Sequence, residues 1–140
     1  MNAGPITLKD IAEMLPFQNY VETFDCPGVN LLTIVQENAR AQGLQTHGIL
    51  QVSGLSYTWR KQGNDVTVEK VMVGGKPLDE NKTYKIASID YVDGNSDLYY
   101  KITPADVNDT GLLLSDVITD AVKNAGTIDS KIQGRIKQVK

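Results

Sequence analysis

The chain has 140 residues, of which 41% are apolar, and its net charge is -3; this is the size and composition of one globular domain. Fourteen Lys and Arg residues against seventeen Asp and Glu residues disfavour non-specific binding to nucleic acid or to an anionic membrane. Cys26 and His47 are the single cysteine and the single histidine, which excludes an internal disulfide and leaves almost no histidines for a metal site or a catalytic triad. No apolar run approaches the ~20 residues that cross a bilayer, so we expect no membrane span.

The N-terminal region predicts a helix followed by a strand. Thr7 and Asp10 have the spacing of a capping box, and apolar residues then recur at helical spacing. Because the residue before a proline is pushed out of the helical region, this helix should end before Pro16. Aromatic and β-branched residues over 19–25 predict a strand. A second helix is expected over 28–42, with Gly43 as its C-cap.

The middle of the chain is rich in predicted strands. Leu55, Tyr57 and Trp59 alternate with polar residues, which is typical of a strand with one buried face. The apolar phase changes between Val68 and Val71, so we expect a bulge near residues 69–70. We expect strands at 55–60, 66–73 and 83–89.

The last third begins with the least regular stretch of the chain, residues 90–108, which is rich in Asp, Asn, Gly and Tyr. Long irregular stretches in compact domains are often functional. An apolar stripe from Leu114 to Val122 then predicts a helix that Gly126 ends. Residues 134–139 are expected to add a last strand.

Seven segments, taken together, resemble the C-terminal domain of the 5'-nucleotidase family. They are ITLKD at 6–10, LPFQN at 15–19, LQVSGL at 50–55, GKPLD at 75–79, KTY at 82–84, DTGLLL at 109–114 and GRI at 134–136. The segments occur in the family's order and at compatible spacing. The resemblance implies an α+β fold of mixed β-sheets flanked by helices, in one domain over residues 1–140.

The resemblance also implies a division of labour between two domains. In that family an N-terminal metallophosphoesterase domain carries two divalent metal ions and a catalytic Asp–His pair, and the C-terminal domain supplies the nucleoside pocket. This chain has no Asp-x-His or Gly-Asn-His segment, so no catalytic or metal residue is expected in it. We therefore expect a fragment of a longer hydrolase that acts in the periplasm or outside the cell, with the catalytic domain in cis or in trans.

Four substrate-binding residues follow from the resemblance. Phe17 corresponds to the family's first stacking aromatic residue, and Tyr91 corresponds to the second. Asn19 stands where some members contact the base, and Asp97 where the family binds the ribose hydroxyls. The chemistry suits these roles, because two rings can sandwich any base at ~1–3 kcal/mol per stacked face. A carboxylate can also accept both protons of a vicinal diol.

Each of these residues also has a simpler interpretation. Phe17 could be a core ring at the end of the first helix, and Tyr91 could be a loop tyrosine bonded to the backbone. Asn19 could be a turn-forming residue without a ligand contact, and Asp97 could be a solvated acid in a turn. The family usually has Gly-Gly-Asp-Gly where residues 95–98 read Asn-Ser-Asp-Leu. Because Ser and Leu tolerate positive φ poorly, this loop should hold Asp97 differently.

Alternative functions stay open at this point. Asp93, Asn95 and Asp97 alternate like the start of a calcium loop, but Leu98 and Pro104 occupy positions that need Gly and Glu. A related cyclic-nucleotide phosphodiesterase would keep the aromatic clamp and act on a different phosphate. A docking or dimerisation module with a decayed pocket is the alternative from another class. The expected ligand is a nucleoside or nucleotide, with no nucleic-acid polymer as a partner.

Overall fold

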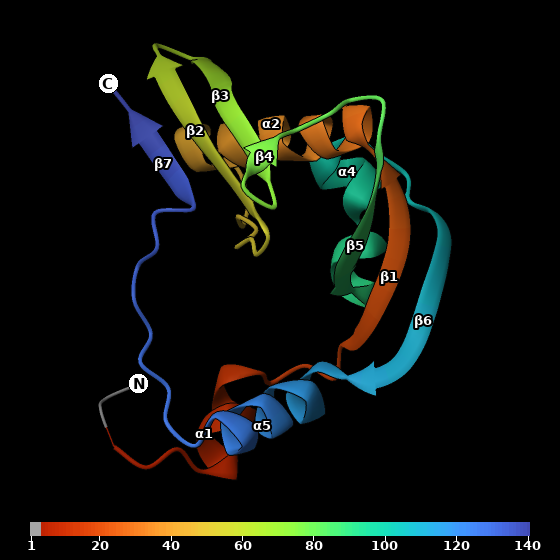
Figure 1. Ribbon diagram of the computed structural model, residues 1–140, viewed down its shortest axis with the longest axis vertical. Coiled ribbons are helices and arrows are strands. Elements are labelled where there is room, and N and C mark those ends of the chain that lie inside the picture. The colour runs from red at the N-terminus through yellow and green to blue at the C-terminus, as the bar shows by residue number, and fades with distance from the viewer. Residues whose placement is uncertain (1–3) are drawn as a thin grey trace.

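The computed structural model describes residues 4–140 and arranges them as helices and two β-sheets (Figure 1). The helices are α1 (Leu8–Met14), α2 (Gly28–Leu44), α3 (Asp90–Asp93), α4 (Ser96–Tyr100) and α5 (Leu114–Ala125). The strands are β1 (Tyr20–Pro27), β2 (Leu55–Gln62), β3 (Asp65–Val73), β4 (Lys76–Pro77), β5 (Thr83–Ile89), β6 (Ala105–Leu113) and β7 (Ile136–Val139). The expected α+β class is confirmed.

The described strands pair in two separate sheets. A three-stranded sheet has the order β5-β1-β6, and both of its pairings are antiparallel. A four-stranded sheet has the order β4-β3-β2-β7 and is mixed, because β7 pairs parallel to β2. In Figure 1, α2 crosses between the two sheets. The molecule is therefore layered around one long helix.

The hydrophobic core lies where α2 meets both sheets. Its buried members are Phe24, Cys26, Leu31, Val35, Ala39, Tyr57, Trp59, Val66, Tyr100 and Ile102. One polar residue, Asn38, is buried among them, and both its amide nitrogen and its amide oxygen are hydrogen-bonded. Its Nδ2 group donates to Leu50 O at 3.0 Å and to the Tyr57 hydroxyl at 2.9 Å, and its Oδ1 accepts from Leu50 N at 2.7 Å. These bonds attach the 45–54 connection to the helix.

The first two helices form as the sequence predicts, with one correction at the end of α2. Thr7 and Asp10 make the reciprocal capping box of α1. The expected C-cap at Gly43 is wrong, because α2 continues to Leu44 and Gln45 takes the left-handed cap conformation at φ 56°. Gly43 instead lies against the sheet, where a Cβ would be 2.7 Å from Val66 Cγ2.

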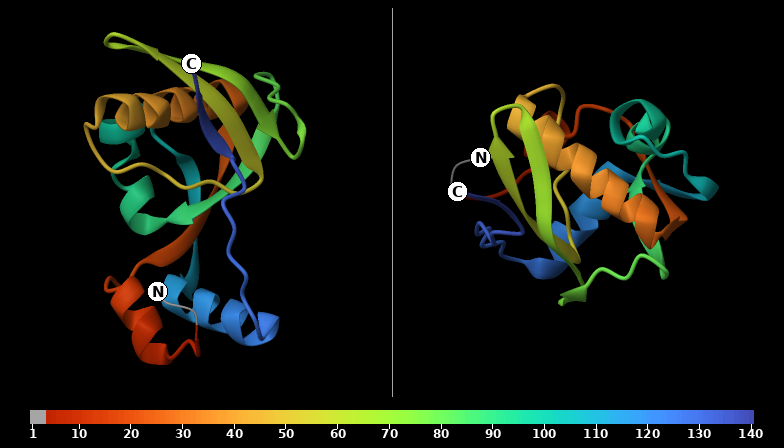
Figure 2. Two further views of the ribbon diagram at one scale, coloured as in Figure 1. Left: turned by 90° about the vertical axis from the view of Figure 1, so that its left-hand side faces the viewer. Right: turned by 90° about the horizontal axis from the view of Figure 1, so that it is seen from above.

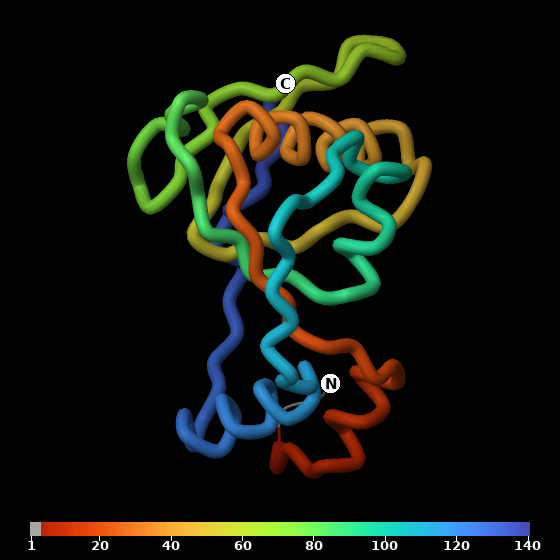
Figure 3. Tube along the Cα trace, turned by 90° about the vertical axis from the view of Figure 1, so that its right-hand side faces the viewer, coloured from red at the N-terminus to blue at the C-terminus, as the bar shows by residue number. Residues whose placement is uncertain are grey.

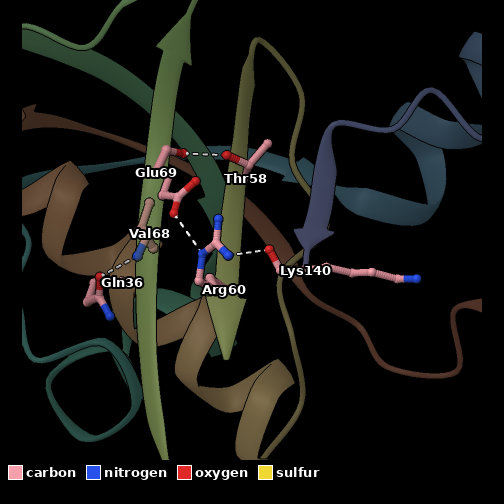
Figure 4. Close-up of polar contacts among 6 residues, drawn as sticks. All are labelled: Gln36, Thr58, Arg60, Val68, Glu69 and Lys140. Carbon is pink, nitrogen blue, oxygen red and sulfur yellow. Dashed lines mark hydrogen bonds and ion pairs between the residues drawn. The ribbon is translucent and has the colours of Figure 1, made fainter. Parts of the chain in front are cut away.

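Polar contacts hold β2 and β3, the central strands of the four-stranded sheet, to each other and to α2 (Figure 4). Gln36 of α2 donates to Val66 O at 2.6 Å and accepts from Val68 N at 3.2 Å. Arg60 Nε lies 3.2 Å from Glu69 Oε1, and its Nη1 donates to the carbonyl of Lys140. The predicted bulge is confirmed next to this contact: the β2–β3 register shifts, and Lys70 has φ 48°.

The stretch predicted to be irregular is more ordered than expected. Residues 90–100 contain the short helices α3 and α4, and residues 105–113 form β6, which pairs along β1. Sequence reasoning missed β6 because most of its residues are exposed and four of the nine are Asp, Asn or Thr. Asp106 and Gly111 also have positive φ, which breaks the alternation that identifies a strand.

Helices α1 and α5 form a separate end of the molecule (Figure 2). They pack against each other, and β1 and β6 connect them to the rest of the structure. From α5 the chain returns along the molecule to β7 (Figure 3), which confirms the expected last strand. Gly126, at φ 68°, is the C-cap of α5 as predicted. Within the described residues, no helix combines the length and apolar character that a bilayer crossing requires.

Candidate functional site

Two segments far apart in sequence meet at the junction of β1 and β5. The connection 15–19 leads from α1 into β1, and α3 begins where β5 ends. The Asn19 side chain donates from Nδ2 to Asp90 Oδ1 at 2.8 Å. Asp90 Oδ1 also accepts from the backbone N of Tyr91 at 2.7 Å. One carboxylate therefore joins the segment that carries Phe17 to the helix that carries Tyr91.

The two aromatic residues of the predicted clamp are exposed on these segments. Phe17 is 77% exposed and Tyr91 is 60% exposed. Apolar rings of this size are normally buried. The interpretation of Phe17 as a core ring is therefore wrong for the described chain, and both rings are accessible to a ligand.

Asn19 is half-buried and is positioned by contacts on both sides. Besides the side-chain bond to Asp90, its carbonyl accepts from Leu114 N, the first residue of α5, at 2.9 Å. The bond to Asp90 uses one of the two amide hydrogens. The second hydrogen and the amide oxygen remain as groups that can read the edge of a base.

Asp97 is exposed in the first turn of α4, close in sequence to the aromatic residue but on a separate short helix. The side chain of Asn95 donates to Tyr91 O at 2.7 Å and so attaches the start of α4 to α3. Ser96 is buried and donates from Oγ to Asp93 O at 2.7 Å. Asp97 Oδ1 accepts from Leu98 N at 2.7 Å, and Oδ2 is not used in that bond.

Residues 95–98, where the resemblance leads one to expect glycines, form the N-cap and the first turn of α4. None of the residues 95–98 has positive φ; Asn95 has φ -117°, and α4 begins directly after it. The left-handed turn comes later, at Lys101 with φ 58°. The expectation that this loop holds Asp97 differently from a glycine-rich loop stays a prediction.

Asp90 is the residue of this site that sequence reasoning missed. The hydrogen bond from Asn19 holds the pKa of the Asp90 carboxyl below its ordinary value, and the backbone N–H groups of Tyr20 and Tyr91 act in the same direction, against partial desolvation. It is therefore ionised at neutral pH. Its position, at the end of a strand and directly before an aromatic residue, was the available signal.

The remaining candidates of the sequence take no part in this arrangement. Within residues 4–140, no group of three or more His, Cys, Asp or Glu residues is placed to hold a metal ion. His47 packs against the rings of Tyr99 and Tyr100, with centroids 4.9 Å and 5.9 Å away. Cys26 is buried, and burial raises the pKa of its thiol to about 11.

Comparison with known proteins agrees with this arrangement. A family model described as "5'-nucleotidase, C-terminal domain" matches residues 1–103. A 5'-nucleotidase of Vibrio cholerae is 31% identical over 131 residues, which cover 92% of this chain and 23% of that protein. A snake venom 5'-nucleotidase of Gloydius brevicauda is 26% identical over 145 residues, which cover 96% of this chain and 25% of that protein.

Solved structures give the same result for the fold. The crystal structure of a 5'-nucleotidase precursor from Thermus thermophilus superposes with a TM-score of 0.82 and 29% identity, over 97% of this chain and 28% of that one. The chain therefore spans about a quarter of the length of these relatives. Family model and fold agree, and this chain belongs to the family of 5'-nucleotidase C-terminal domains.

Proposed function

We propose that Phe17, Asn19, Tyr91 and Asp97 form the nucleoside-binding site of a 5'-nucleotidase-type phosphohydrolase. One observation carries the proposal. The 2.8 Å bond between Asn19 and Asp90 joins the two segments that bear the exposed rings. A base could enter between the two accessible rings, whose backbone segments are joined through the Asp90 carboxylate.

The four side chains divide the recognition of a nucleoside by chemistry. Phe17 and Tyr91 stack on the two faces of the base, at ~1–3 kcal/mol per face and with little selectivity among bases. Asn19 hydrogen-bonds the base edge with the amide groups that Asp90 leaves available. Asp97 accepts hydroxyl protons of the ribose with the carboxylate oxygen that Leu98 N does not use.

The rest of the reaction belongs to polypeptide outside this chain. The family is that of metal-dependent phosphoesterases, and the proposed partner is a metallophosphoesterase domain with two divalent metal ions. That domain would release phosphate from the nucleotide that this chain holds by its nucleoside. A place of action outside the cytoplasm, in the periplasm or the extracellular space, is supported by the relative from snake venom, which is a secreted fluid.

An amide NMR titration tests the binding role directly. Adenosine and uridine are added to the labelled chain and to its Phe17→Ala variant. Stacking without a phosphate site should give dissociation constants on the order of millimolar. We expect saturable shifts at residues 15–19 and 90–98 that disappear in the variant. Spectra unchanged by both nucleosides would contradict the proposal.

A further inference from the structure

The inner side of α3 carries a buried carboxyl group. Asp93 is 8% exposed, and its Oδ2 has no hydrogen-bond partner among the described residues. It faces a mainly apolar pocket of about 830 Å³, the inner pocket, which β1, β5, the 50–55 connection and α5 line. A carboxylate in such surroundings destabilises the fold unless it is neutralised or a donor reaches it. The fold therefore favours the form of Asp93 that carries a proton.

A second carboxylate lies beside Asp93 on the three-stranded sheet. Glu22 of β1 is the register partner of Ser88 on β5 and of Asp109 on β6, and directly opposed residues of an antiparallel pair project from the same face. Burial raises the pKa of Asp93 to about 6; Ser88 opposes this rise by hydrogen bonding, and the charge and hydrogen bonding of Glu22 add to it. A protonated Asp93 can donate to Glu22, whereas an ionised Asp93 has no proton to donate.

The cation closest in the fold is engaged elsewhere. Lys85 of β5 also lines the inner pocket, but its Nζ lies 2.6 Å from Asp25 Oδ1 of β1, and its side chain is 66% exposed. The ion pairs among residues 4–140 include neither Asp93 nor Glu22. Asp90, on α3 itself, adds a further negative charge. When Asp93 is ionised, the two carboxylates therefore repel each other without a local counter-charge.

The backbone of Asp93 connects the two halves of the candidate site. Tyr91 lies in the same short helix, and the Ser96 hydroxyl donates to the Asp93 carbonyl at 2.7 Å. Ser96 is the first residue of α4, which carries Asp97. A displacement of Asp93 from β1 is therefore transmitted to the aromatic ring on one side and to the proposed ribose contact on the other.

We propose that Asp93 and Glu22 are positioning residues for nucleoside binding, and that a proton held between their carboxyl groups keeps α3 against β1 with Tyr91 and Asp97 in place. The inference rests on the proposed function of this site. When Asp93 releases the proton to solvent, repulsion between the two carboxylates loosens α3 from β1. Nucleoside affinity is then full below the pKa of Asp93, about 6, and falls as the pH rises through it.

Adenosine affinity at two pH values tests the inference. NMR titrations are carried out at about pH 5 and about pH 8, where adenosine itself is uncharged, and binding should be roughly fivefold weaker at the higher pH. The Asp93→Asn and Glu22→Gln variants each remove one of the two charges and keep a hydrogen-bonding side chain. Both should bind with equal affinity at the two pH values, close to that of the wild type at the lower pH. A merely structural role would weaken binding equally at both.

Two variants serve as controls for other titrating groups. Asp65→Asn changes an exposed acid at the start of β3. Histidine side chains change charge near neutral pH, so His47→Gln removes the single histidine of the chain. Both variants should keep the pH dependence of the wild type. Its loss in His47→Gln would assign the effect to the histidine and overturn the inference.

The same spectra without ligand separate this inference from the proposed function. The amides of residues 90–98 should shift with an apparent pKa of about 6 in the wild type and should not do so in Asp93→Asn. Equal adenosine affinity at both pH values would overturn the inference and leave the proposed function standing. Absence of binding at both would overturn the proposed function. The free-chain shifts would then decide the positioning role of the pair: their presence would support it, and their absence would overturn it.

Discussion

Asp90 determines the geometry of the candidate site at the scale of single residues. It is not expected to contact the ligand, yet its carboxylate accepts from both Asn19 and the backbone of Tyr91. The lowered pKa that these donors cause keeps it charged at neutral pH. The proposed ligand contacts are therefore held by a residue that acts through others.

Replacing Tyr91 tests stacking at this scale. The Tyr91→Ala variant should bind adenosine roughly 5- to 150-fold more weakly, because one stacked face contributes ~1–3 kcal/mol. The Tyr91→Phe variant keeps the ring and should bind close to the wild type. NMR titration measures both affinities. Ile132→Ala, at a fully exposed position outside the site, is the control, and equal affinities of the Ala and Phe variants would contradict stacking.

Helix α3 is the element that connects the exposed site to the inner pocket. Tyr91 is exposed, whereas Val92 and Asp93, which follow it, line the pocket. A change on the inner side of this short helix acts on the segment that carries the ring. The stability of α3 should therefore depend on the protonation state of Asp93.

The raised pKa of Asp93 predicts a pH dependence of stability. An aspartate with a pKa near 3.9 when unfolded and about 6 when folded binds its proton more tightly in the folded chain. The stability that protonated Asp93 contributes is therefore fully present below about pH 4 and is lost as the pH rises to about 6, a total of about 2–3 kcal/mol. Urea unfolding at several pH values measures this.

The Asp93→Asn variant should remove most of that fall and be more stable than the wild type at neutral pH. The matched control is Asp97→Asn, which changes an exposed acid on the neighbouring helix and should keep the fall. If the wild type and Asp93→Asn lost the same stability between pH 4 and 6, Asp93 would not be the group that titrates.

The packing of α2 against the sheet gives a prediction for Gly43. Replacing a helical glycine by alanine normally stabilises a helix by about 1 kcal/mol. Here the added Cβ would lie 2.7 Å from Val66 Cγ2 and 3.1 Å from Trp59 Cζ3, both in the buried core. We expect Gly43→Ala to lower the free energy of unfolding by about 1 kcal/mol.

Thermal or urea unfolding of Gly43→Ala checks this, with Gly48→Ala as the matched control. A Cβ at Gly48 would meet nothing within 4 Å, so that variant should stay within about 0.5 kcal/mol of the wild type. A Gly43→Ala variant more stable than the wild type would show that the core can move to admit the methyl group.

Elements with a strong local pattern could be predicted from the sequence, and those set by tertiary contacts could not. The capping box of Thr7 and the alternation of Tyr57 and Trp59 depend on neighbours in sequence. The strand β6 has few buried side chains, and its pairing with β1 determines it. Gly43 has the sequence position of a helix cap. The real reason for a glycine there is the close approach of Val66, which is distant in the sequence and leaves no local signal.

The candidate site was predictable only in part for the same reason. The positions of Phe17, Asn19, Tyr91 and Asp97 came from a resemblance, and their roles in binding remain predictions. The contact between Asn19 and Asp90 joins residues 71 positions apart. No periodicity or spacing in the sequence indicates such a contact, so only the folded chain shows it.

At the scale of the whole molecule, the chain corresponds to one part of the longer proteins that it matches. It spans about a quarter of the matched 5'-nucleotidases. The proposed division of labour places the metal ions in a domain outside this chain, and it predicts no phosphate release from AMP by this chain with manganese, zinc or magnesium. A phosphate assay checks this, with the Vibrio cholerae enzyme as the positive control; metal-dependent release would contradict the division of labour.

The central claim is that the rings of Phe17 and Tyr91 enclose the base of a nucleoside. Intermolecular nuclear Overhauser effects between adenosine and the labelled chain measure this most directly. The account predicts contacts from the adenine protons to both rings, and contacts from the ribose protons to the side of Asp97. Contacts from adenine to the pocket beside β5, or to neither ring, would contradict it.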